Sequence, residues 1–332
     1  MKTNIEIADS LDEYLLHWTK CIADVHWFDN PSPFDYNREE MAEEIAKEFN
    51  QPECIHLVAK SERSNEVLGT LKVKIQADVG TLGRWEPAIP VKHRKSRVGE
   101  ALIEEAFIIL RKNHSSRARC ILKFPFNQLV KARWLLSLYQ KCGFVKGRPS
   151  NILLLADLSK VTIKPSALRD VRIVDGGDFS LEDFADFTLR AYMSMPQDKE
   201  VHQGDPYISN RENVLKVLEA IKAGNMGFFP PECCQIAKLK TDIAGFIIGF
   251  IRKETKYQPT FGVIGELGVF PEFRRKGIAM FLIANIFACF RKHGCSYSLV
   301  GTPKLNRSAI KLYCKIGYAP AFEQIDFEKT LS

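Results

Sequence analysis

Long apolar runs and a recognisable leader are both missing from this sequence. No stretch of apolar residues approaches the roughly 18–20 that are needed to cross a bilayer. The first residues, Met1 to Ile7, lack the positive charge followed by an apolar segment that marks a secretory signal. These absences argue against a membrane-spanning or exported protein, so we expect a cytoplasmic protein with no membrane partner.

Cysteine and histidine patterns typical of metal sites are also missing. The 9 cysteines include no C-x-x-C pair, and their odd number argues against a complete disulfide framework. The 7 histidines include no H-x-x-x-H pair. Cys289 and Cys314 lie within apolar helical patterns, so we expect them to be small buried hydrophobic residues. The sequence therefore predicts no metal.

The composition that is present is typical of a globular protein. Hydrophobic residues make up 45% and charged residues 26%, which is enough to form a real core. A length of 332 residues fits two domains of about 150–170 residues each. The formal net charge of +7 leaves three explanations open, namely a polyanionic ligand, a weak affinity for nucleic acid, or solubility alone.

Two parts of the sequence recur in the same order. The segment from Arg94 to Ile103 corresponds to the segment from Arg274 to Ile283 at a constant offset of 180, sharing the Arg, a small residue five positions later and a Leu-Ile pair. Further on, Leu-Tyr-x-x-x-Gly-Phe at 138–144 corresponds to Leu-Tyr-x-x-x-Gly-Tyr at 312–318, at an offset of 174. Two correspondences in one order indicate a duplicated domain.

Hydrophobic periodicity predicts a parallel order of helices and strands in the two halves. In the first half we expect elements at 11–23, 41–49, 55–60, 67–75, 101–111, 118–124, 133–141 and 152–157. In the second half we expect them at 171–174, 181–191, 211–223, 234–238, 243–251, 261–269, 276–292, 296–300, 307–316 and 325–328.

The boundary between the halves is expected at 159–168, which contains Pro165 and few large apolar residues. This boundary predicts domains at residues 1–160 and 166–332. The polar segment 193–210 is expected to be a long loop within the second domain, either a binding loop or a disordered connector.

The segment most typical of a ligand site runs from Glu266 to Ala279. Its apolar strand ends at Pro271, and a basic turn containing Gly277 leads directly into an amphipathic helix. Such a turn directs free backbone N–H groups and the positive end of the helix at one point, which suits a phosphate or pyrophosphate. The alternative is a solvated basic helix start. Neither the G-x-x-x-x-G-K-[ST] pattern nor the G-x-G-x-x-G pattern occurs here.

These residues resemble a known family. Arg274-x-x-Gly277-x-Ala279 is similar to the R/Q-x-x-G-x-G/A signature of the GNAT superfamily of N-acetyltransferases, in which it cradles the pyrophosphate of coenzyme A. The preceding Leu-x-Val-x-Pro at 267–271 looks like the fourth strand of the family and its exit. Residues 306–318 are similar to the downstream N-x-x-A-x-x-L-Y-x-x-x-G-F/Y element at matching spacing. The resemblance covers about residues 171–329, and residues 1–158 by repetition.

The resemblance implies an α/β fold of two tandem GNAT domains, each a mixed, mostly antiparallel, splayed sheet flanked by helices. It implies acetyl-CoA as co-substrate, held by residues of the strand, the turn and a later helix: Leu267, Gly268, Val269, Arg274, Arg275, Lys276, Gly277, Ile278, Ala279 and Asn306. In the family an amine attacks the thioester directly in a ternary complex. The implied function is therefore N-acetyl transfer to a primary amine of a small molecule or a peptide.

Two residues are candidates for proton transfer. Tyr313 matches the usual general acid of the family, although a buried core aromatic also explains a tyrosine there. Glu266 is the candidate general base, but side chains alternate along a strand, so it points opposite to Leu267 and Val269. A bulge at a neighbouring glycine, Gly265 or Gly268, would re-aim it, and a water chain is the alternative base. Asn306 either supports the cofactor or caps its helix.

The first half departs from the family pattern at several matched positions. Arg97 stands in place of the signature glycine, and Pro87 removes a backbone donor on the strand. Ala132 replaces the asparagine, whereas Gly99, Tyr139 and Glu86 are retained. We expect a degenerate GNAT domain that does not catalyse.

Other functions remain open. A non-catalytic acyl-CoA-binding regulatory protein would retain the turn without turnover, and a tandem scaffold would also suit transfer of a different acyl group. Nucleic-acid binding is ranked last, because a pyrophosphate already explains the basic turn. The acceptor amine is unknown, and a homodimer is left open.

Overall fold

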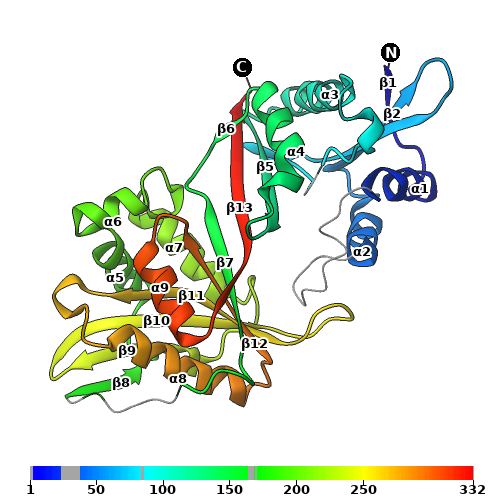
Figure 1. The fold of residues 1–332 in the computed structure, drawn as a ribbon. Helices are drawn as coiled ribbons and strands as arrows, with labels where there is room; N and C mark the ends of the chain where they lie inside the picture. The colour runs from blue at the N-terminus through cyan, green and yellow to red at the C-terminus, as the bar shows by residue number, and fades with distance from the viewer. Residues whose placement is uncertain (1–2, 24–37, 84–85, 164–167, 169, 332) are drawn as a thin grey trace. The chain divides into compact units, whose positions relative to one another are not determined.

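The computed structural model describes residues 3–23, 38–83, 86–163, 168 and 170–331, which form two compact units. Unit 1 comprises Met1–Gly147 and Glu323–Ser332, and unit 2 comprises Arg148–Phe322. Each unit has a mixed, mostly antiparallel sheet flanked by helices (Figure 1). This is the tandem α/β fold that the sequence predicts. None of the described helices is long and apolar enough to span a membrane.

In the sheet of unit 1, β1 to β4 pair antiparallel in succession, and β4 pairs parallel with β5. Its strands lie in the order β1 (Thr3–Ile7), β2 (Cys54–Ser61), β3 (Val67–Lys74), β4 (Val79–Leu82), β5 (Arg117–Pro125) and β13 (Ala319–Thr330), with the short β6 (Val145–Lys146) pairing with β13. The helices of this unit are α1 (Leu11–Ile22), α2 (Arg38–Glu48), α3 (Val98–Lys112) and α4 (Leu129–Lys141).

The sheet of unit 2 repeats this arrangement, with one parallel pair between β11 and β12. Its strands lie in the order β7 (Asn151–Asp157), β12 (Tyr297–Pro303), β11 (Phe261–Val269), β10 (Asp242–Arg252), β9 (Cys234–Leu239) and β8 (Val171–Asp175). Its helices are α5 (Leu181–Met193), α6 (Pro196–Val201), α7 (Arg211–Lys222), α8 (Ile278–Lys292) and α9 (Arg307–Ile316).

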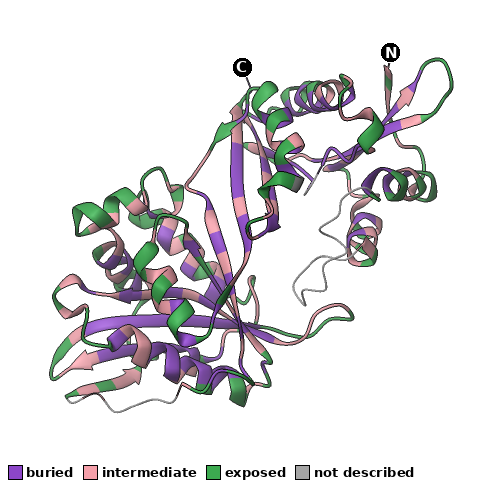
Figure 2. Cartoon of the chain, viewed as in Figure 1, coloured by how far each residue is buried: buried purple, intermediate pink, exposed green. Residues whose placement is uncertain are grey.

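The core of unit 2 forms on both faces of β10, whose residues from Ala244 to Ile251 are all buried (Figure 2). On one face, α8 packs so closely that a Cβ atom on Gly249 would lie 2.5 Å from Ile286. On the other face, side chains of α5 and α7 cluster with β10 aromatics such as Phe246 and Phe250. Burial on two faces explains why β10 reads as a continuous apolar run.

The last strands of the two repeats are exchanged between the units. β7 and the end of β13 occupy equivalent positions at the offset of 174. Nevertheless β7 pairs with β12 of unit 2, while β13 lies next to β5 of unit 1, where Asp326 forms an ion pair with Arg119 at 3.1 Å. The expected domains, 1–160 and 166–332, place a single boundary at 159–168, whereas residue contacts divide the chain at Gly147 and again at Phe322.

The parallel strands β11 and β12 part halfway along their length. They pair only from Phe261↔Tyr297 to Ile264↔Val300, although β11 continues to Val269. Along its other edge, β11 stays paired with β10 up to Val269. Backbone groups on the open edge of β11 therefore face the gap between the two strands, which is the splay that the resemblance implies.

The two cysteines expected to be buried behave differently. Cys289 is buried but forms a disulfide with Cys233. Cys314 is exposed, because α9 buries the face that carries Tyr313 and Ile316 and turns Cys314 toward solvent. The expectation for Cys314 was therefore wrong.

Candidate functional site

The turn between β11 and α8 presents an uncapped helix start. Gly277 is the N-cap residue of α8, has a left-handed backbone with φ 82°, and no side chain bonds the helix end. Arg275 also has positive φ, at 63°, and Arg275, Lys276 and Gly277 are all exposed. Because the first N–H groups of a helix lack partners within it, this turn offers several donors and the positive end of the helix dipole to an anion.

Arg274 differs from Arg275 and Lys276 because its guanidinium is hydrogen-bonded within the protein. Its Nε donates to the Val269 carbonyl at 3.1 Å, one terminal nitrogen donates to both Asp198 oxygens at 3.1 and 2.9 Å, and the other donates to the Ala191 carbonyl at 2.7 Å. The guanidinium therefore ties the turn to α5 and α6. Charge for an anionic ligand is left to Arg275 and Lys276.

Ile278, Ala279 and Gly268 have mainly backbone groups to offer to a ligand, because their side chains are buried, small or absent. The side chain of Ile278 is buried in the core, whereas Ala279 is small and half-buried. Gly268 has no room for a side chain, since a Cβ atom would lie 2.4 Å from Phe246 and 2.8 Å from Ala191. The packing of α5 on β11 is thus sufficient to require glycine at 268.

Glu266 lies at a bulge in β11. Ile248 faces Glu266 while Gly249 faces Ile264, so Gly265 is the additional residue, one of the two bulge positions considered from the sequence. Glu266 is only 5% exposed and lies on the face opposite to Leu267 and Val269. Burial raises the pKa of this carboxyl to about 7, against the opposing effect of two tyrosine hydrogen bonds.

Two tyrosines donate to the two oxygens of Glu266. Tyr207, in the short 3₁₀ helix η4 (Pro206–Ile208), lies 2.5 Å from Oε1, and Tyr192, at the end of α5, lies 2.9 Å from Oε2. The Tyr192 hydroxyl also lies 3.2 Å from the Leu267 carbonyl and 3.4 Å from its N–H. The open edge of β11 is therefore contacted by a side chain from α5, directly beside Glu266.

Tyr313 projects from α9 toward the same region. It is 5% exposed and packs edge-on against Tyr318, whose hydroxyl bonds Ser298 at 2.6 Å. Burial, together with the nearby negative charge of Glu266, raises the pKa of Tyr313 well above its ordinary value. Within the described part of the chain, the Tyr313 hydroxyl has no hydrogen-bond partner. The structure thus brings Glu266 and Tyr313 within electrostatic reach of each other.

Asn306 caps α9. Its side-chain oxygen accepts from the Ala309 N–H at 3.1 Å and from the Ser308 hydroxyl at 3.0 Å. Of the two explanations considered for this residue, capping is therefore the one that the geometry supplies directly.

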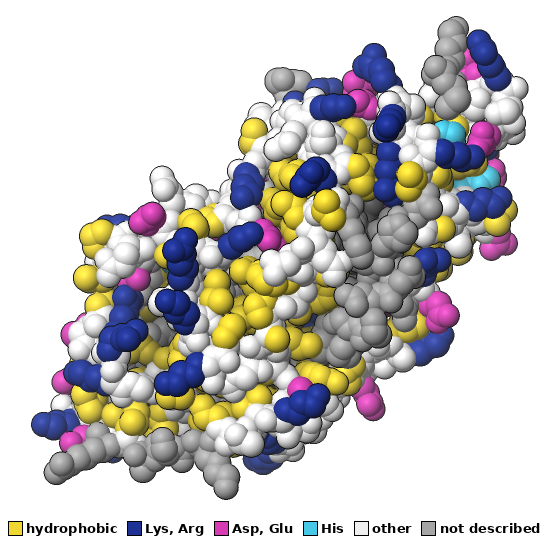
Figure 3. Space-filling view, in the orientation of Figure 1, with side chains coloured by type: hydrophobic (Ala, Val, Ile, Leu, Met, Phe, Trp, Pro, Cys, Tyr) yellow, Lys and Arg dark blue, Asp and Glu magenta, His cyan; other side chains and the backbone are white. Residues whose placement is uncertain are grey.

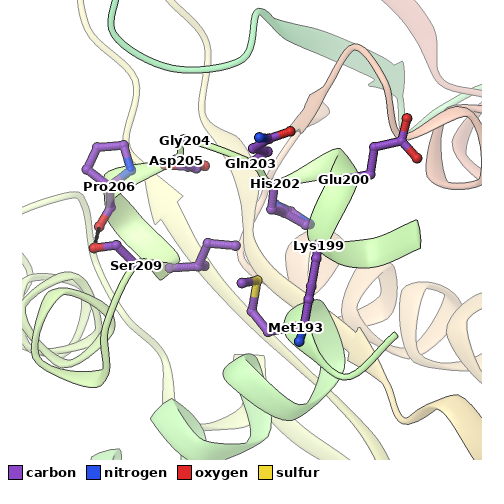
Figure 4. Close-up of a pocket in the computed structure, with 10 residues that line it drawn as sticks. Met193, Lys199, Glu200, His202, Gln203, Gly204, Asp205, Pro206 and Ser209 are labelled. Carbon is purple, nitrogen blue, oxygen red and sulfur yellow. Dashed lines mark hydrogen bonds between the residues drawn. The ribbon is translucent and has the colours of Figure 1, made fainter. Parts of the chain in front are cut away.

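The segment between α5 and α7, expected to be a long loop, contains α6 and η4 and is anchored at two points. Asp198 binds Arg274, and Tyr207 binds Glu266. The segment lines a pocket of about 600 Å³ with charged residues of both signs and His202 (Figure 4). His202 stacks on Tyr192 with ring centroids 5.0 Å apart. The sequence indicated this segment but gave no signal for Asp198 or Tyr207, because each lies far along the chain from its partner.

The equivalent positions of unit 1 are arranged differently. The Arg94 Nε donates to the Ile89 carbonyl at 3.1 Å, which repeats the Arg274 contact at the offset of 180. However, Arg97 begins α3 with φ −82° in place of the left-handed glycine. Tyr139 is fully buried and its hydroxyl donates to the backbone carbonyl of Glu86 at 2.5 Å. Unlike Tyr313, this tyrosine is already committed to a structural hydrogen bond.

Positive charge forms no large patch on the face drawn in Figure 3, where Lys and Arg side chains are scattered among other types. Many cations in the described chain are paired, including Lys72 with Glu48 at 2.6 Å and Arg211 with Asp186 at 2.7 Å. This pattern offers little support for a nucleic-acid surface.

The chain is similar to known proteins in sequence over part of its length and in overall fold. Residues 200–318 match the model of the acetyltransferase (GNAT) family. A GCN5-related N-acetyltransferase from Sphaerobacter thermophilus has a similar structure, with a TM-score of 0.61 and 14% identity over 99% of this chain and 96% of that one.

Two further solved structures share the fold. A tandem GNAT protein of the clavulanic acid biosynthesis pathway gives a TM-score of 0.53 and 14% identity over 100% of this chain and 99% of that one. The glucosamine N-acetyltransferase region of a fungal multi-domain β-N-acetylglucosaminidase gives 0.60 and 13%, over 98% of this chain and 38% of that one. No curated protein sequence matches the chain at a significant level.

Proposed function

We propose that unit 2 transfers an acetyl group from acetyl-CoA to a primary amine, because residues 200–318 match the acetyltransferase (GNAT) family model and lie within this unit. The observation that carries this proposal is the pairing of two groups with complementary roles. Glu266 has a pKa of about 7, and the nearby Tyr313 retains its proton and has a hydroxyl without a partner in the described chain.

The acetyl-CoA substrate fits two features of unit 2. Its pyrophosphate suits the uncapped start of α8, where a side chain at 277 would be strained by a φ of 82° and would bring a Cβ atom 3.5 Å from Leu168. Its pantetheine arm suits the gap between β11 and β12, where β12 leaves the edge of β11 unpaired and the Tyr192 hydroxyl contacts the Leu267 backbone groups that the arm would take over. Arg275 and Lys276 supply the compensating positive charge.

The chemistry requires a free amine, a polarised thioester and a protonated leaving thiolate. Glu266 is the proposed base, removing a proton from the acceptor ammonium directly or through a water, since its pKa of about 7 makes it half ionised near neutral pH. The amine then attacks the thioester carbonyl. Tyr313 is the proposed acid that donates its proton to the departing sulfur, which its raised pKa allows at any physiological pH.

The acceptor amine is proposed to approach through the pocket of the 193–209 segment. His202 forms part of its wall and stacks on Tyr192, which in turn touches Glu266. A route along this wall ends at the proposed base. Asp205 and Glu200 on the same wall would favour a cationic ammonium before it is deprotonated.

The decisive experiment is calorimetric titration of acetyl-CoA into the wild type and into Gly277→Glu, with Arg97→Glu as the matched substitution in unit 1. The proposal expects one site per chain, lost in Gly277→Glu because a carboxylate enters the anion cradle, and retained in Arg97→Glu. Binding that survives Gly277→Glu, or that is lost only in Arg97→Glu, would exclude a cradle in unit 2. Release of free thiol with a panel of amines then tests turnover.

A further inference from the structure

A second cluster of chemically reactive side chains lies at the opposite end of α8 from the anion cradle. Cys289 lies in the last turn of α8 and His293 is its C-cap residue, while Glu232 and Cys233 belong to the short 3₁₀ helix η5 (Pro231–Cys233) that precedes β9. The Glu232 oxygen, the Cys289 sulfur and a His293 ring nitrogen all lie within 4.8 Å of one another. Cys233 and Cys289 are joined as a disulfide.

The spacing of these atoms is close to that of a tetrahedral metal site. Zinc bonds of about 2.0–2.3 Å to oxygen, nitrogen and sulfur place neighbouring ligand atoms roughly 3.3–3.8 Å apart. Glu232 Oε1 and His293 Nε2 are already 3.0 Å apart. Residues four apart on a helix share one face, so Cys289 and His293 approach the same point without any change in the backbone.

We propose that, once the disulfide is reduced, Cys233, Cys289, His293 and Glu232 bind one divalent cation of the zinc type. In this arrangement two sulfurs, one imidazole nitrogen and one carboxylate oxygen complete a tetrahedral ligand set. Cation binding would replace the disulfide as the link between α8 and the start of β9, and would hold α8 in place in a reducing environment.

The reduction step balances with a small dithiol as the reductant. The dithiol gives up two electrons and two protons and closes to its own disulfide, while the Cys233–Cys289 bond breaks and each sulfur takes one proton. The cation then displaces both protons, because the ligands are thiolates.

Surrounding residues suit such a site. The Glu232 carboxylate already lies 3.0 Å from the His293 ring nitrogen and within ion-pair distance of Lys292. Two thiolates and a carboxylate around a divalent cation leave one negative charge, and Lys292, 3.2 Å from Glu232, balances it. Phe228 packs edge-on against the His293 ring at 5.8 Å and would restrict its rotation.

The first repeat offers an internal comparison. At the offset of 180, the positions of Cys289 and His293 are occupied by Ile109 and Asn113, which bind no metal in this manner. The ligand set is therefore specific to unit 2. Residue spacing in the sequence does not point to this cluster, because its members come from two segments whose cysteines are 56 residues apart.

The test titrates Co²⁺ into the full chain after reduction by a dithiol and removal of the reagent. We expect thiolate-to-cobalt absorption in the near ultraviolet and intense visible bands typical of tetrahedral cobalt, saturating at one equivalent and abolished by competing Zn²⁺. The diamide-oxidised chain should show neither signal. His293→Gln should weaken cobalt affinity at least about tenfold, whereas His114→Gln, at an exposed histidine near the end of α3, should leave it unchanged.

Cys289→Ser should remove most of the thiolate absorption, and His293→Gln covers the case in which the cysteine variant fails to fold, because His293 is partly exposed. The proposal is overturned if the reduced chain gives no thiolate-to-cobalt band, or if His293→Gln binds cobalt as tightly as His114→Gln. A signal that is equal in the oxidised and reduced chains also overturns it. None of these outcomes depends on acetyl transfer.

Discussion

The hydrogen bond from Tyr207 to Glu266 should set the pH at which the proposed acetyl transfer begins. The hydroxyl lies 2.5 Å from Glu266 Oε1 and lowers the pKa of a carboxyl that burial otherwise raises. Tyr207→Phe removes this donor while leaving the ring in place. The carboxylate loses its stabilisation but the protonated acid loses less, so the pKa of Glu266 must rise from about 7.

The size of the rise follows from the strength of the bond. A hydrogen bond to a charged acceptor contributes about 1.5–3 kcal/mol and one to a neutral acceptor about 0.5–1.5 kcal/mol. The difference of roughly 1.4 kcal/mol corresponds to about one pKa unit. Near pH 7 the ionised fraction would fall from about one half to about one tenth, so kcat/KM should fall about fivefold there and recover above roughly pH 9.

The assay is the pH profile of kcat/KM for thiol release from acetyl-CoA with a fixed amine. The acidic limb should move to higher pH by about one unit in Tyr207→Phe. It should stay in place in Tyr257→Phe, which changes a tyrosine on the loop between β10 and β11. An acidic limb that does not move, or that moves to lower pH, would refute the assignment of Glu266 as the group that Tyr207 stabilises in its ionised form.

Three further outcomes are expected. Tyr313→Phe should lower kcat by about 10²–10⁴-fold while leaving the calorimetric affinity for acetyl-CoA unchanged, and an unaffected kcat would exclude Tyr313 as the acid. The matched variant Tyr139→Phe should lower stability, because it leaves the buried carbonyl of Glu86 unpaired. It should leave the affinity for acetyl-CoA intact. Glu86 is fully buried and burial raises its pKa from 4.5 to about 7, so folding takes up a proton and its contribution to stability is lost as pH rises through that range. Glu86→Gln should therefore gain up to about 3 kcal/mol relative to the wild type in urea unfolding at pH 8 and less than about 1 kcal/mol at pH 5, and the opposite trend would contradict the raised pKa. A fragment of residues 166–332 lacks β7, leaves β12 with an unpaired edge, and should unfold at lower urea concentration and less cooperatively than the full chain, as circular dichroism would measure.

Local patterns in the sequence were sufficient for most elements of the fold. The expected helix at 276–292 corresponds to α8, and the expected strand at 261–269 corresponds to β11 with identical bounds. Both predictions succeed because hydrophobic periodicity and the identity of the flanking residues are local properties of the sequence. The short α6 was missed, since its six residues, of which four are polar, give no amphipathic signal and its start depends on Pro196 and on the Asp198 contact with Arg274.

The candidate site was predictable only where it is built from consecutive residues. The residues of the signature turn, from Arg274 to Ala279, can be identified from their spacing in the sequence. In contrast, Tyr207 reaches Glu266 across 59 residues, and Arg274 reaches Asp198 and Ala191 across 76 and 83 residues. Such contacts depend on how α5, α6 and η4 pack on β11, and no periodicity in a single sequence encodes that packing.

The exchange of the last strands also delays the folding of unit 1 during synthesis. Unit 1 contains residues that follow unit 2 in the chain, from Glu323 onward, and its core includes Ile325, Phe327 and Leu331. A nascent chain leaves the ribosome from its N-terminus, and its first domain ordinarily folds while the rest is being made. Here the edge of β5 stays uncovered until the whole of unit 2 and the residues from Glu323 onward have been made. A chain interrupted before Glu323 would therefore be expected to misfold in unit 1, although every residue of that unit up to Gly147 is present.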